Sequence, residues 1–127
     1  LTGGKRLGNQ GFFFEPTVIE NVTDNAKIMI DEPFGPVAPL NSFSDEDEII
    51  YKANALPFGL AAYAYTNNKS LARKLTNNLE SGMVAINSQI VSTPETPFGG
   101  IKESGYGSEG GIEGLEAYLK PKFISEM

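Results

Sequence analysis

The chain of 127 residues contains no cysteine, no histidine and no tryptophan. The absence of cysteine excludes disulfide bonds and thiolate metal sites, and the absence of histidine removes the commonest metal ligand. Without these residue types the usual pairs of a nucleophile and a general base cannot be assembled from this chain. Carboxylates, lysines and serines remain, but no pair of them has a spacing that indicates catalysis. We therefore expect no catalytic residue and no metal site in the chain.

Long apolar runs and clusters of basic residues are missing as well. No apolar stretch approaches the length of a membrane span, and ten lysines and arginines are scattered in a chain whose net charge is −6. We therefore expect no nucleic acid and no membrane among its partners. The composition is typical of a soluble globular domain, for which we expect a cytoplasmic location. Because the first residue is leucine rather than methionine and no leader follows, we also expect a fragment of a longer protein.

The first part of the chain predicts one extended segment and one short helix. Residues 12–22 are rich in aromatic and β-branched side chains, which favour an extended backbone. Residues 24–32 favour a helix with Asp24 or Asn25 as the N-cap. Pro33 should end this helix, because the residue before a proline is pushed out of the helical region.

The middle of the chain, residues 37–87, alternates between strand and helix patterns. Strands are predicted at residues 37–43, 60–66 and 83–87. This alternation implies parallel strands joined by right-handed crossovers, which makes the fold class α/β. Ligands collect at the carboxyl ends of the strands in such sheets. The loop after Asn87 and the turn at residues 56–59 are therefore both candidate sites.

Two helices are predicted between these strands. The first starts at Ser44, with acidic residues in its first turn and an apolar stripe on one face. The second is capped by Asn67 or Asn68 and is also apolar on one face. The predicted apolar residues are Ile49, Ile50 and Ala53 in the first helix and Leu71, Leu75 and Leu79 in the second.

The last third of the chain is dominated by an irregular segment. Residues 88–111 are rich in glycine, proline and serine and show little periodicity. Such a length is unusual for an idle connection and indicates a functional loop. A last short helix is predicted over residues 111–119, followed by an extended tail over residues 120–127.

Three segments together resemble a known family. They are EPFGPV at residues 32–37, ANALPFGLAAYAYT at residues 53–66 and NSQIVSTPETPFGGIKESGYGSEGG at residues 87–111. In this order and spacing they resemble the C-terminal part of the NAD(P)-dependent aldehyde dehydrogenases. Within that family, EGGIEGLEAYLKPKF at residues 109–123 and the serine-containing loop are most similar to the succinate-semialdehyde dehydrogenase group.

The resemblance implies a fold and an activity. Residues 1–119 would form an incomplete parallel-sheet catalytic domain of the aldehyde dehydrogenase fold, and residues 120–127 a C-terminal oligomerisation strand of a homo-oligomer. The parent would oxidise a small aldehyde, such as succinic semialdehyde or a similar semialdehyde, to a carboxylate with NAD or NADP as cofactor. In this family the catalytic cysteine, glutamate and asparagine lie upstream. The isolated chain is therefore predicted to be inactive.

The resemblance also implies a cofactor site in the first of these segments. Glu32 matches the family glutamate that accepts hydrogen bonds from the nicotinamide-ribose hydroxyls, which an ionised carboxylate can do with both oxygens. Phe34 matches the aromatic residue that packs beside the ribose and the nicotinamide. Pro33 and Pro36 restrict the backbone on either side, and Gly35 permits a close approach.

The resemblance implies a substrate wall in the long loop. Phe98 matches a family aromatic residue that lines the aldehyde tunnel, where Gly99 and Gly100 allow a tight turn. Ser92 matches a loop serine that helps to bind the distal carboxylate in the semialdehyde group. Ser108 departs from the family pattern, which usually has arginine there, and this departure predicts a looser loop.

Plainer explanations of the same residues remain open from the sequence. Glu32 could be a surface carboxylate at a helix end, and Phe34 and Phe98 could be core aromatics. Ser92 could be an ordinary loop hydroxyl. The rival function is a non-catalytic oligomerisation or interaction module, whose tail adds a strand to a neighbouring sheet. The two functions separate on Glu32→Ala, which such a module would tolerate and the enzyme would not.

Overall fold

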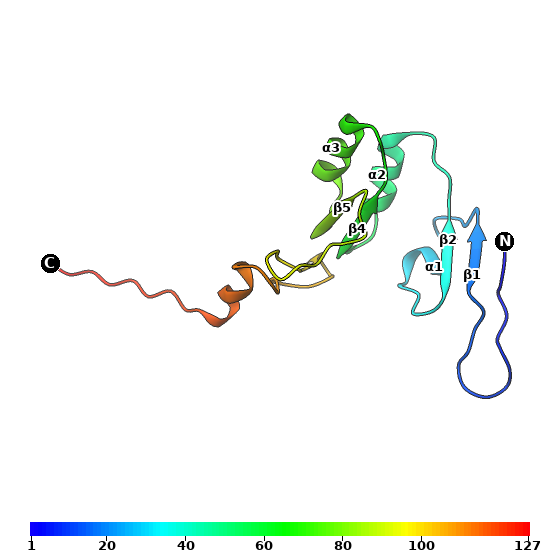
Figure 1. Ribbon diagram of the computed structural model, residues 1–127, viewed down its shortest axis with the longest axis horizontal. Coiled ribbons are helices and arrows are strands. Elements are labelled where there is room, and N and C mark those ends of the chain that lie inside the picture. The colour runs from blue at the N-terminus through cyan, green and yellow to red at the C-terminus, as the bar shows by residue number, and fades with distance from the viewer. The chain divides into compact units, whose positions relative to one another are not determined.

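The computed structural model describes residues 1–127, which divide into two units, Leu1–Asp45 and Glu46–Met127. The first unit contains β1 (Thr17–Glu20), α1 (Lys27–Ile30) and β2 (Val37–Leu40). The second contains α2 (Glu46–Asn54), β3 (Phe58–Gly59), β4 (Ala61–Ala64), α3 (Lys69–Asn78), β5 (Met83–Ile86), β6 (Ile101–Lys102) and a 3-10 helix at Glu113–Tyr118. The strands form three separate two-stranded sheets, and Figure 1 labels the strands of two of them, β1 with β2 and β4 with β5.

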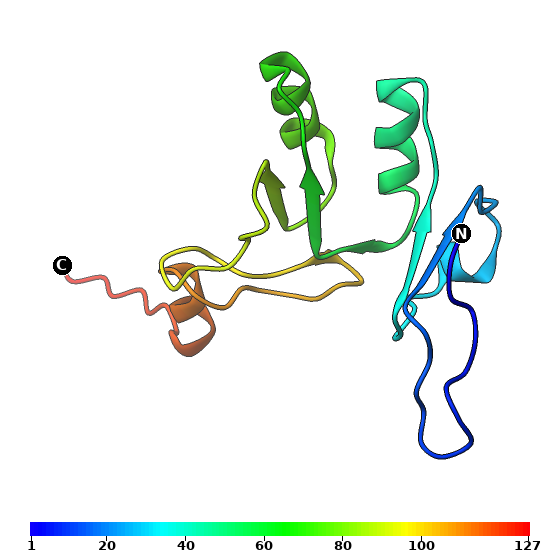
Figure 2. The same ribbon diagram turned by 45° about the vertical axis from the view of Figure 1, so that its right-hand side comes forward.

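The first unit is built on a strand–helix–strand arrangement. Strand β1 pairs with β2 in parallel, from Thr17 opposite Val37 to Glu20 opposite Leu40. The segment before β1 folds back as a hairpin, whose two arms are seen in Figure 2. Thr17 is buried at its base, where its hydroxyl donates to the Glu15 carbonyl oxygen at 2.7 Å and accepts from the amide of Gly4 at 2.8 Å.

Helix α1 corrects one prediction. Its N-cap is Ala26, which makes no side-chain capping bond, so the expected cap at Asp24 or Asn25 is wrong. The reason is a turn just before the helix, in which the Ala26 amide donates to the Thr23 carbonyl oxygen at 2.9 Å. The helix ends at Ile30, and Asp31 is already extended, two residues before Pro33.

The second unit repeats the strand–helix–strand arrangement. Strand β4 pairs with β5 in parallel, from Ala61 opposite Met83 to Ala64 opposite Ile86, and α3 connects them. Met83 and Ala85 point to the buried side of β5 and are the buried apolar residues of the chain. The α/β class is confirmed, but β2 pairs with β1 rather than joining the sheet of β4 and β5.

Helix α2 starts later and is less buried than its sequence predicts. It begins at Glu46, two residues after the expected start at Ser44. Ile49 and Ile50 are half-buried, whereas Ala53 is exposed. The apolar stripe on this helix is therefore only partly covered within the chain.

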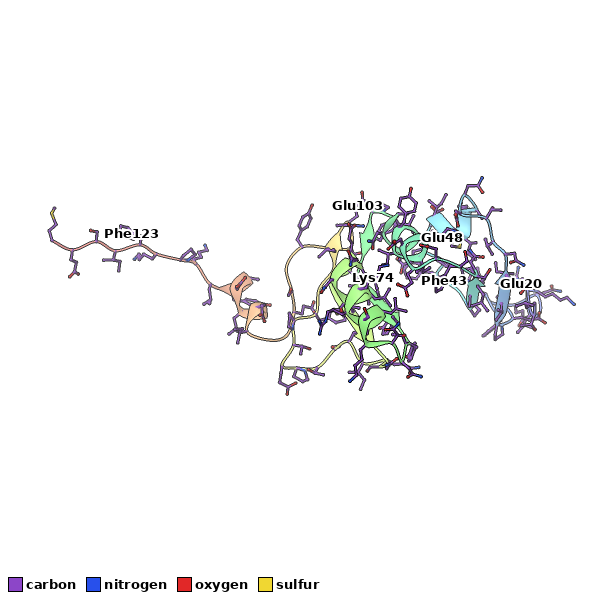
Figure 3. All side chains as sticks on the ribbon, turned by 90° about the horizontal axis from the view of Figure 1, so that it is seen from above. Glu20, Phe43, Glu48, Lys74, Glu103 and Phe123 are labelled. Carbon is purple, nitrogen blue, oxygen red and sulfur yellow. The ribbon has the colours of Figure 1, made fainter.

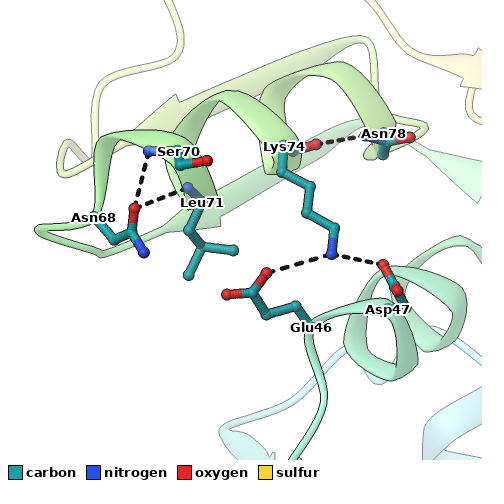
Figure 4. A network of polar contacts seen from close by, with 7 residues as sticks. All are labelled: Glu46, Asp47, Asn68, Ser70, Leu71, Lys74 and Asn78. Atoms are coloured by element: carbon teal, nitrogen blue, oxygen red, sulfur yellow. Dashed lines mark hydrogen bonds and ion pairs between the residues drawn. The ribbon is translucent and has the colours of Figure 1, made fainter.

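Helix α3 begins as predicted, at a side-chain cap. The Asn68 side-chain oxygen accepts from the amides of Ser70 at 2.9 Å and Leu71 at 3.2 Å, as Figure 4 shows. These bonds satisfy two of the amides that a helix start leaves without an intrahelical partner. Leu71 and Leu75 lie half-buried on one face, and Leu79 is the C-cap.

One lysine connects α3 to the start of α2. The Lys74 ammonium lies 2.7 Å from an Asp47 carboxylate oxygen and 3.3 Å from one of Glu46, and Figure 4 shows it between them. The hydrogen bond with Asp47 is the main reason why the pKa of Lys74 lies above 10.5, its ordinary value. These ion pairs link the two helices.

The rest of the second unit is mostly irregular. Strand β6 pairs with β3 in antiparallel fashion, and Phe98 forms an isolated antiparallel bridge with Glu109. The predicted last helix is present as a 3-10 helix. The tail beyond it has no regular secondary structure, and Phe123, labelled in Figure 3, is 91% exposed. No helix in the chain is both long and apolar enough to cross a membrane.

Candidate functional site

The EPFGPV segment forms a tight backbone turn at the start of β2. The Gly35 amide donates to the Pro33 carbonyl oxygen at 3.0 Å, and the Val37 amide donates to the Gly35 carbonyl oxygen at 2.9 Å. The Pro36 carbonyl oxygen then accepts from the Thr17 amide of β1 at 2.8 Å. Two prolines and these short-range bonds therefore limit how far the segment can move.

The two side chains predicted to bind a cofactor are exposed on this turn. Phe34 is 95% exposed, so it is not a core aromatic of this chain. Glu32 is also exposed, and a Cβ added at Gly35 would meet no atom within 4 Å. The turn therefore carries an exposed carboxylate and, two residues later, an exposed aromatic ring, and a carboxylate can accept hydrogen bonds from hydroxyl groups.

The two residues predicted to contact a substrate line one pocket in the second unit. Ser92 is exposed and Phe98 is half-buried, and they share a pocket of about 360 Å³. The bridge beside it is short, because Phe98 and Glu109 each donate their amide to the other's carbonyl oxygen, at 2.6 and 2.7 Å. The full lining is Ser92, Thr93, Pro94, Phe98, Glu109 and Gly110.

Four residues of this lining were not predicted from the sequence. Thr93 and Pro94 are neighbours of Ser92 in the chain, so the position of Ser92 itself was a signal for them. Glu109 and Gly110 are brought in by the bridge to Phe98, which joins residues eleven positions apart. Glu109 is the one ionisable residue of the lining, and its negative charge would repel an anionic group placed there.

The glycines of the loop are explained by close approach of backbone segments. A Cβ at Gly99 would lie 2.5 Å from the Gly107 carbonyl oxygen, and one at Gly100 would lie 2.8 Å from the Ser104 carbonyl oxygen. Neither glycine has a positive φ, and neither lies in a turn. The expected turn is therefore replaced by packing of the loop against itself, which side chains at these positions would block.

The predicted site residues lie in two places along the fold. Glu32 and Phe34 lie two residues apart in the first unit, and Ser92 and Phe98 line the same pocket in the second. Within the described chain, residues 1–127, no group of three or more acidic residues could hold a metal ion.

Comparison with known proteins gives the family of this chain. The profile of the aldehyde dehydrogenase family matches residues 1–124. The chain belongs to the aldehyde dehydrogenase family. The resemblance found in the three sequence segments is confirmed over nearly the whole chain.

Two relatives illustrate the range of substrates named for proteins similar to this chain. An NADP(+) succinate-semialdehyde dehydrogenase of Escherichia coli strain K12 is 47% identical over 124 residues, which are 98% of this chain and 26% of that protein. A 3-sulfolactaldehyde dehydrogenase of Pseudomonas putida is 44% identical over 124 residues and is covered to the same extent. Their substrates differ, although their identities to this chain are similar.

Solved structures of aldehyde dehydrogenases agree with the fold. The crystal structure of an aldehyde dehydrogenase from Brucella melitensis biovar abortus 2308 superposes with a TM-score of 0.91 and 48% identity. The match covers 98% of this chain and 25% of that one. Other solved relatives are described as NAD-dependent or as complexes with NAD+. The chain thus spans about a quarter of the length of the aldehyde dehydrogenases that it matches.

Proposed function

We propose that residues 1–127 supply the nicotinamide-ribose clamp and part of the substrate wall of an NAD(P)-dependent aldehyde dehydrogenase. The observation that carries this proposal is the pair of exposed side chains, Glu32 and Phe34, on a turn restrained by two prolines. Membership of the family over residues 1–124 supports it. The nucleophile and base of the reaction then come from polypeptide outside these residues, since the chain has neither cysteine nor histidine.

Glu32 and Phe34 have separate tasks in this proposal. The nicotinamide of NAD or NADP, when bound, supplies the acceptor for the hydride of the aldehyde. Glu32 accepts hydrogen bonds from the two hydroxyls of the adjoining ribose, and the ring of Phe34 packs beside the sugar. Holding the sugar at both hydroxyls restricts rotation of the ring attached to it, which favours a reactive orientation.

The aldehyde is proposed to be succinic semialdehyde or a similar semialdehyde. Phe98 would contact the apolar part of this substrate, and the Ser92 hydroxyl would donate to its distal carboxylate. The name of the relative from Escherichia coli supports this choice. Because Glu109 lies in the same lining, the cationic groups that balance the substrate's carboxylate must come from outside this pocket.

The tail is proposed to be an oligomerisation strand, following a portion of the catalytic domain at residues 1–119. Phe123 and Ile124 in this tail are 91% and 70% exposed. A neighbouring sheet edge would cover such side chains and would pair with the free backbone groups of an extended segment. This arrangement predicts a homo-oligomer. The cytoplasmic location also stays a prediction.

The isolated chain is predicted to be inactive. It carries no cysteine for the thiolate chemistry of the family, and its buried side chains are few, among them Met83, Ala85 and Thr17. Many large apolar side chains, including Phe12 and Tyr106 at 102% exposure, have no cover within the chain. Aldehyde-dependent formation of NAD(P)H by the purified 127-residue chain would contradict this prediction.

The proposed function is tested by replacing each of two neighbouring carboxylates, Glu32 and Asp31, in the full-length protein that contains residues 1–127. Glu32→Ala should lower hydride transfer about ten- to a hundredfold, because hydrogen bonds to a charged group are worth about 1.5–3 kcal/mol. Asp31→Ala is the matched control, since Asp31 is exposed and its ion pair with Lys27, at 3.7 Å, lies outside the site.

Transient kinetics with a semialdehyde substrate would separate the outcomes. A selective loss in Glu32→Ala supports the ribose clamp. Full hydride transfer in both variants would reject it. If the unaltered protein oxidises no aldehyde and still forms an oligomer, the non-catalytic interaction module is the better description.

A further inference from the structure

Lys102 has an unusual backbone conformation for its residue type. Its φ is 56°, in the left-handed region that non-glycine residues seldom adopt. Such a conformation is unfavourable and persists where surrounding contacts hold it. Lys102 lies in β6, within the loop that carries the substrate-wall residues, so the contacts that hold it are also contacts of that loop.

The ammonium group of Lys102 uses all of its hydrogen-bonding capacity inside the chain. It donates to the carbonyl oxygens of Asn54 at 3.0 Å and Leu56 at 3.2 Å, and it lies 2.5 Å from a carboxylate oxygen of Glu80. An ammonium has three donors, and three acceptors surround this one. Asn54 ends α2, where a positive charge also complements the negative end of the helix.

The partners of Lys102 form a junction between the ends of two helices. The side chain of Asn54 donates to the Asn78 carbonyl oxygen at 2.7 Å and accepts from the Glu80 amide at 2.9 Å. Asn78 is the last residue of α3. The Lys102 ammonium therefore joins the loop to a point where α2 and α3 are already bonded to each other.

Backbone contacts beside Lys102 run to the same region. The Glu103 amide donates to the Pro57 carbonyl oxygen at 2.8 Å, and the Ser104 hydroxyl accepts from the Gly59 amide at 2.9 Å. Phe58 pairs with Lys102 in the short ladder of β3 and β6. The anchored stretch 101–104 lies between Phe98 and Glu109, whose bridge forms one side of the pocket.

We propose that Lys102 is a positioning residue for the substrate wall, which it orders by tying the loop to the helix ends. Lys102 does not line the pocket itself, so its effect is exerted through the Phe98–Glu109 bridge. The kinetic part of this inference rests on the proposed function. The structural part does not, because order in the bridge can be measured without any substrate.

The first experiment measures backbone hydrogen exchange in the full-length protein with Lys102→Met. Methionine keeps the length of the side chain and the cost of the positive φ, so the variant removes only the ammonium. Exchange at the amides of Phe98 and Glu109 should accelerate roughly tenfold or more, since each bond to a charged group contributes about 1.5–3 kcal/mol. The Asn87 amide, bonded to the Ala64 carbonyl oxygen at 2.8 Å, should keep its rate.

Three further variants make this result specific. Lys102→Arg retains the positive charge and should restore part of the protection. Glu80→Gln leaves both carbonyl contacts of Lys102 in place, so it should produce a smaller change of the same kind even if Lys102→Met does not fold. Lys69→Met, at the exposed start of α3, is the lysine control and should change nothing at the bridge.

The second experiment compares kinetic constants for the same variants. Lys102→Met should raise the KM for the aldehyde severalfold or more, while kcat and the Kd for NAD(P)H change little, because Glu32 and Phe34 lie on a different segment. Unchanged exchange at Phe98 and Glu109, or equal acceleration at all amides, would overturn the positioning role. Selective acceleration in a protein that oxidises no aldehyde would uphold that role and reject the proposed function.

Discussion

The two strand–helix–strand segments of the chain have the same topology and differ in their helices. Each pairs two four-residue parallel strands. Helix α1 has four residues and no side-chain cap, whereas α3 has ten and is capped by Asn68. Forming the first turn of a helix is unfavourable, so a stable helix needs further hydrogen bonds and packing to offset that cost. The comparison indicates that a cap and an apolar face extend a helix that the topology alone leaves short.

The two segments also end in the same asparagine contact. After β2, the Asn41 side chain accepts from the Val22 amide at 2.8 Å and donates to the Val22 carbonyl oxygen at 2.9 Å. After β5, the Asn87 side chain makes the same pair of bonds with Thr66, at 2.8 and 2.9 Å. Each asparagine side chain thus extends the hydrogen bonding of its parallel strand pair by one residue beyond the end of the strand.

The backbone at these two ends differs in one respect. The second segment places both the left-handed backbone, with φ of 54°, and the bridging amide on Asn87. The first segment divides these features between Asn21, with φ of 55°, and Asn41. Asn87 therefore carries two roles where the first segment uses two residues.

The largest expected effect concerns this double role. Asn87→Ala removes two hydrogen bonds, each worth about 0.5–1.5 kcal/mol, and leaves a left-handed alanine that costs about 1–2 kcal/mol. It should therefore destabilise its strand pair by about 2–5 kcal/mol. Asn41→Ala removes only the two bonds and should cost about 1–3 kcal/mol. The measurement is the free energy of local opening, from hydrogen exchange of the paired strands in the full-length protein.

A glycine variant separates the two roles of Asn87. Asn87→Gly loses the bonds but adopts the left-handed conformation without the penalty of a side chain. Its cost should fall close to that of Asn41→Ala. Equal costs for Asn87→Ala and Asn41→Ala would show that the backbone conformation contributes nothing.

A smaller effect is expected at the helix caps. Asn68→Ala should destabilise α3 by about 1 kcal/mol, the usual cost of losing an N-cap side chain. Ala26→Ser, at the matching position of α1, should stabilise that helix, because Ala26 has the extended backbone that a capping residue needs. Hydrogen exchange along each helix gives both changes.

Asn67→Ala is the control for the cap prediction. Asn67 precedes the N-cap and is exposed, so its replacement should leave α3 unchanged. An equal loss in Asn67→Ala and Asn68→Ala would contradict the assignment of the cap. No gain in Ala26→Ser would show that α1 is kept short by its surroundings rather than by a missing cap.

The smallest effect concerns the charge contact between α2 and α3. Because the pKa of Lys74 is raised above 10.5, the contact stabilises the folded protein fully below that pH. This stabilisation is lost as the pH rises through the raised pKa, where the folded state also releases the proton. Asp47→Asn should lower the pKa of Lys74 more than Glu46→Gln does, since the bond with Asp47 is the main cause of the shift.

The titration of Lys74 can be followed by NMR, through the chemical shift of its Cε methylene group. The pKa of Lys74 should be highest in the unaltered protein, lower in Glu46→Gln and lowest in Asp47→Asn. The reverse order of the two variants would mean that Glu46, rather than Asp47, holds the ammonium. The first unit has no second helix that α1 could contact in this way. This absence adds to the difference between the two segments.

Local signals in the sequence predicted most elements and one helix cap. A strand lies within each predicted range, at Val37–Leu40, Ala61–Ala64 and Met83–Ile86, and Asn68 is one of the two predicted caps. Side-chain periodicity and capping act within a few residues, so the sequence shows them. The predicted caps of α1 and the start of α2 at Ser44 were wrong. In α1 a turn closed by the Thr23 carbonyl oxygen moved the helix start to Ala26.

The candidate sites divide in the same way. Glu32 and Phe34 were identified from one short segment, and the exposure of both agrees with a binding role. The proximity of Ser92 to Phe98 follows from residues close in sequence. The contribution of Glu109 to the pocket and the contacts of Lys102 did not follow, since the latter join residues as many as 48 positions apart.

By itself the sequence determined the family, the α/β class, the missing catalytic residue types and the stiff turn at residues 32–37. These depend on residue identity and short-range order, which need no knowledge of distant contacts. Only the tertiary structure decided which strands pair, which residues share the pocket and why Lys102 is held with a positive φ. Such contacts depend on free energies of pairing and packing between distant segments, and no local propensity specifies them.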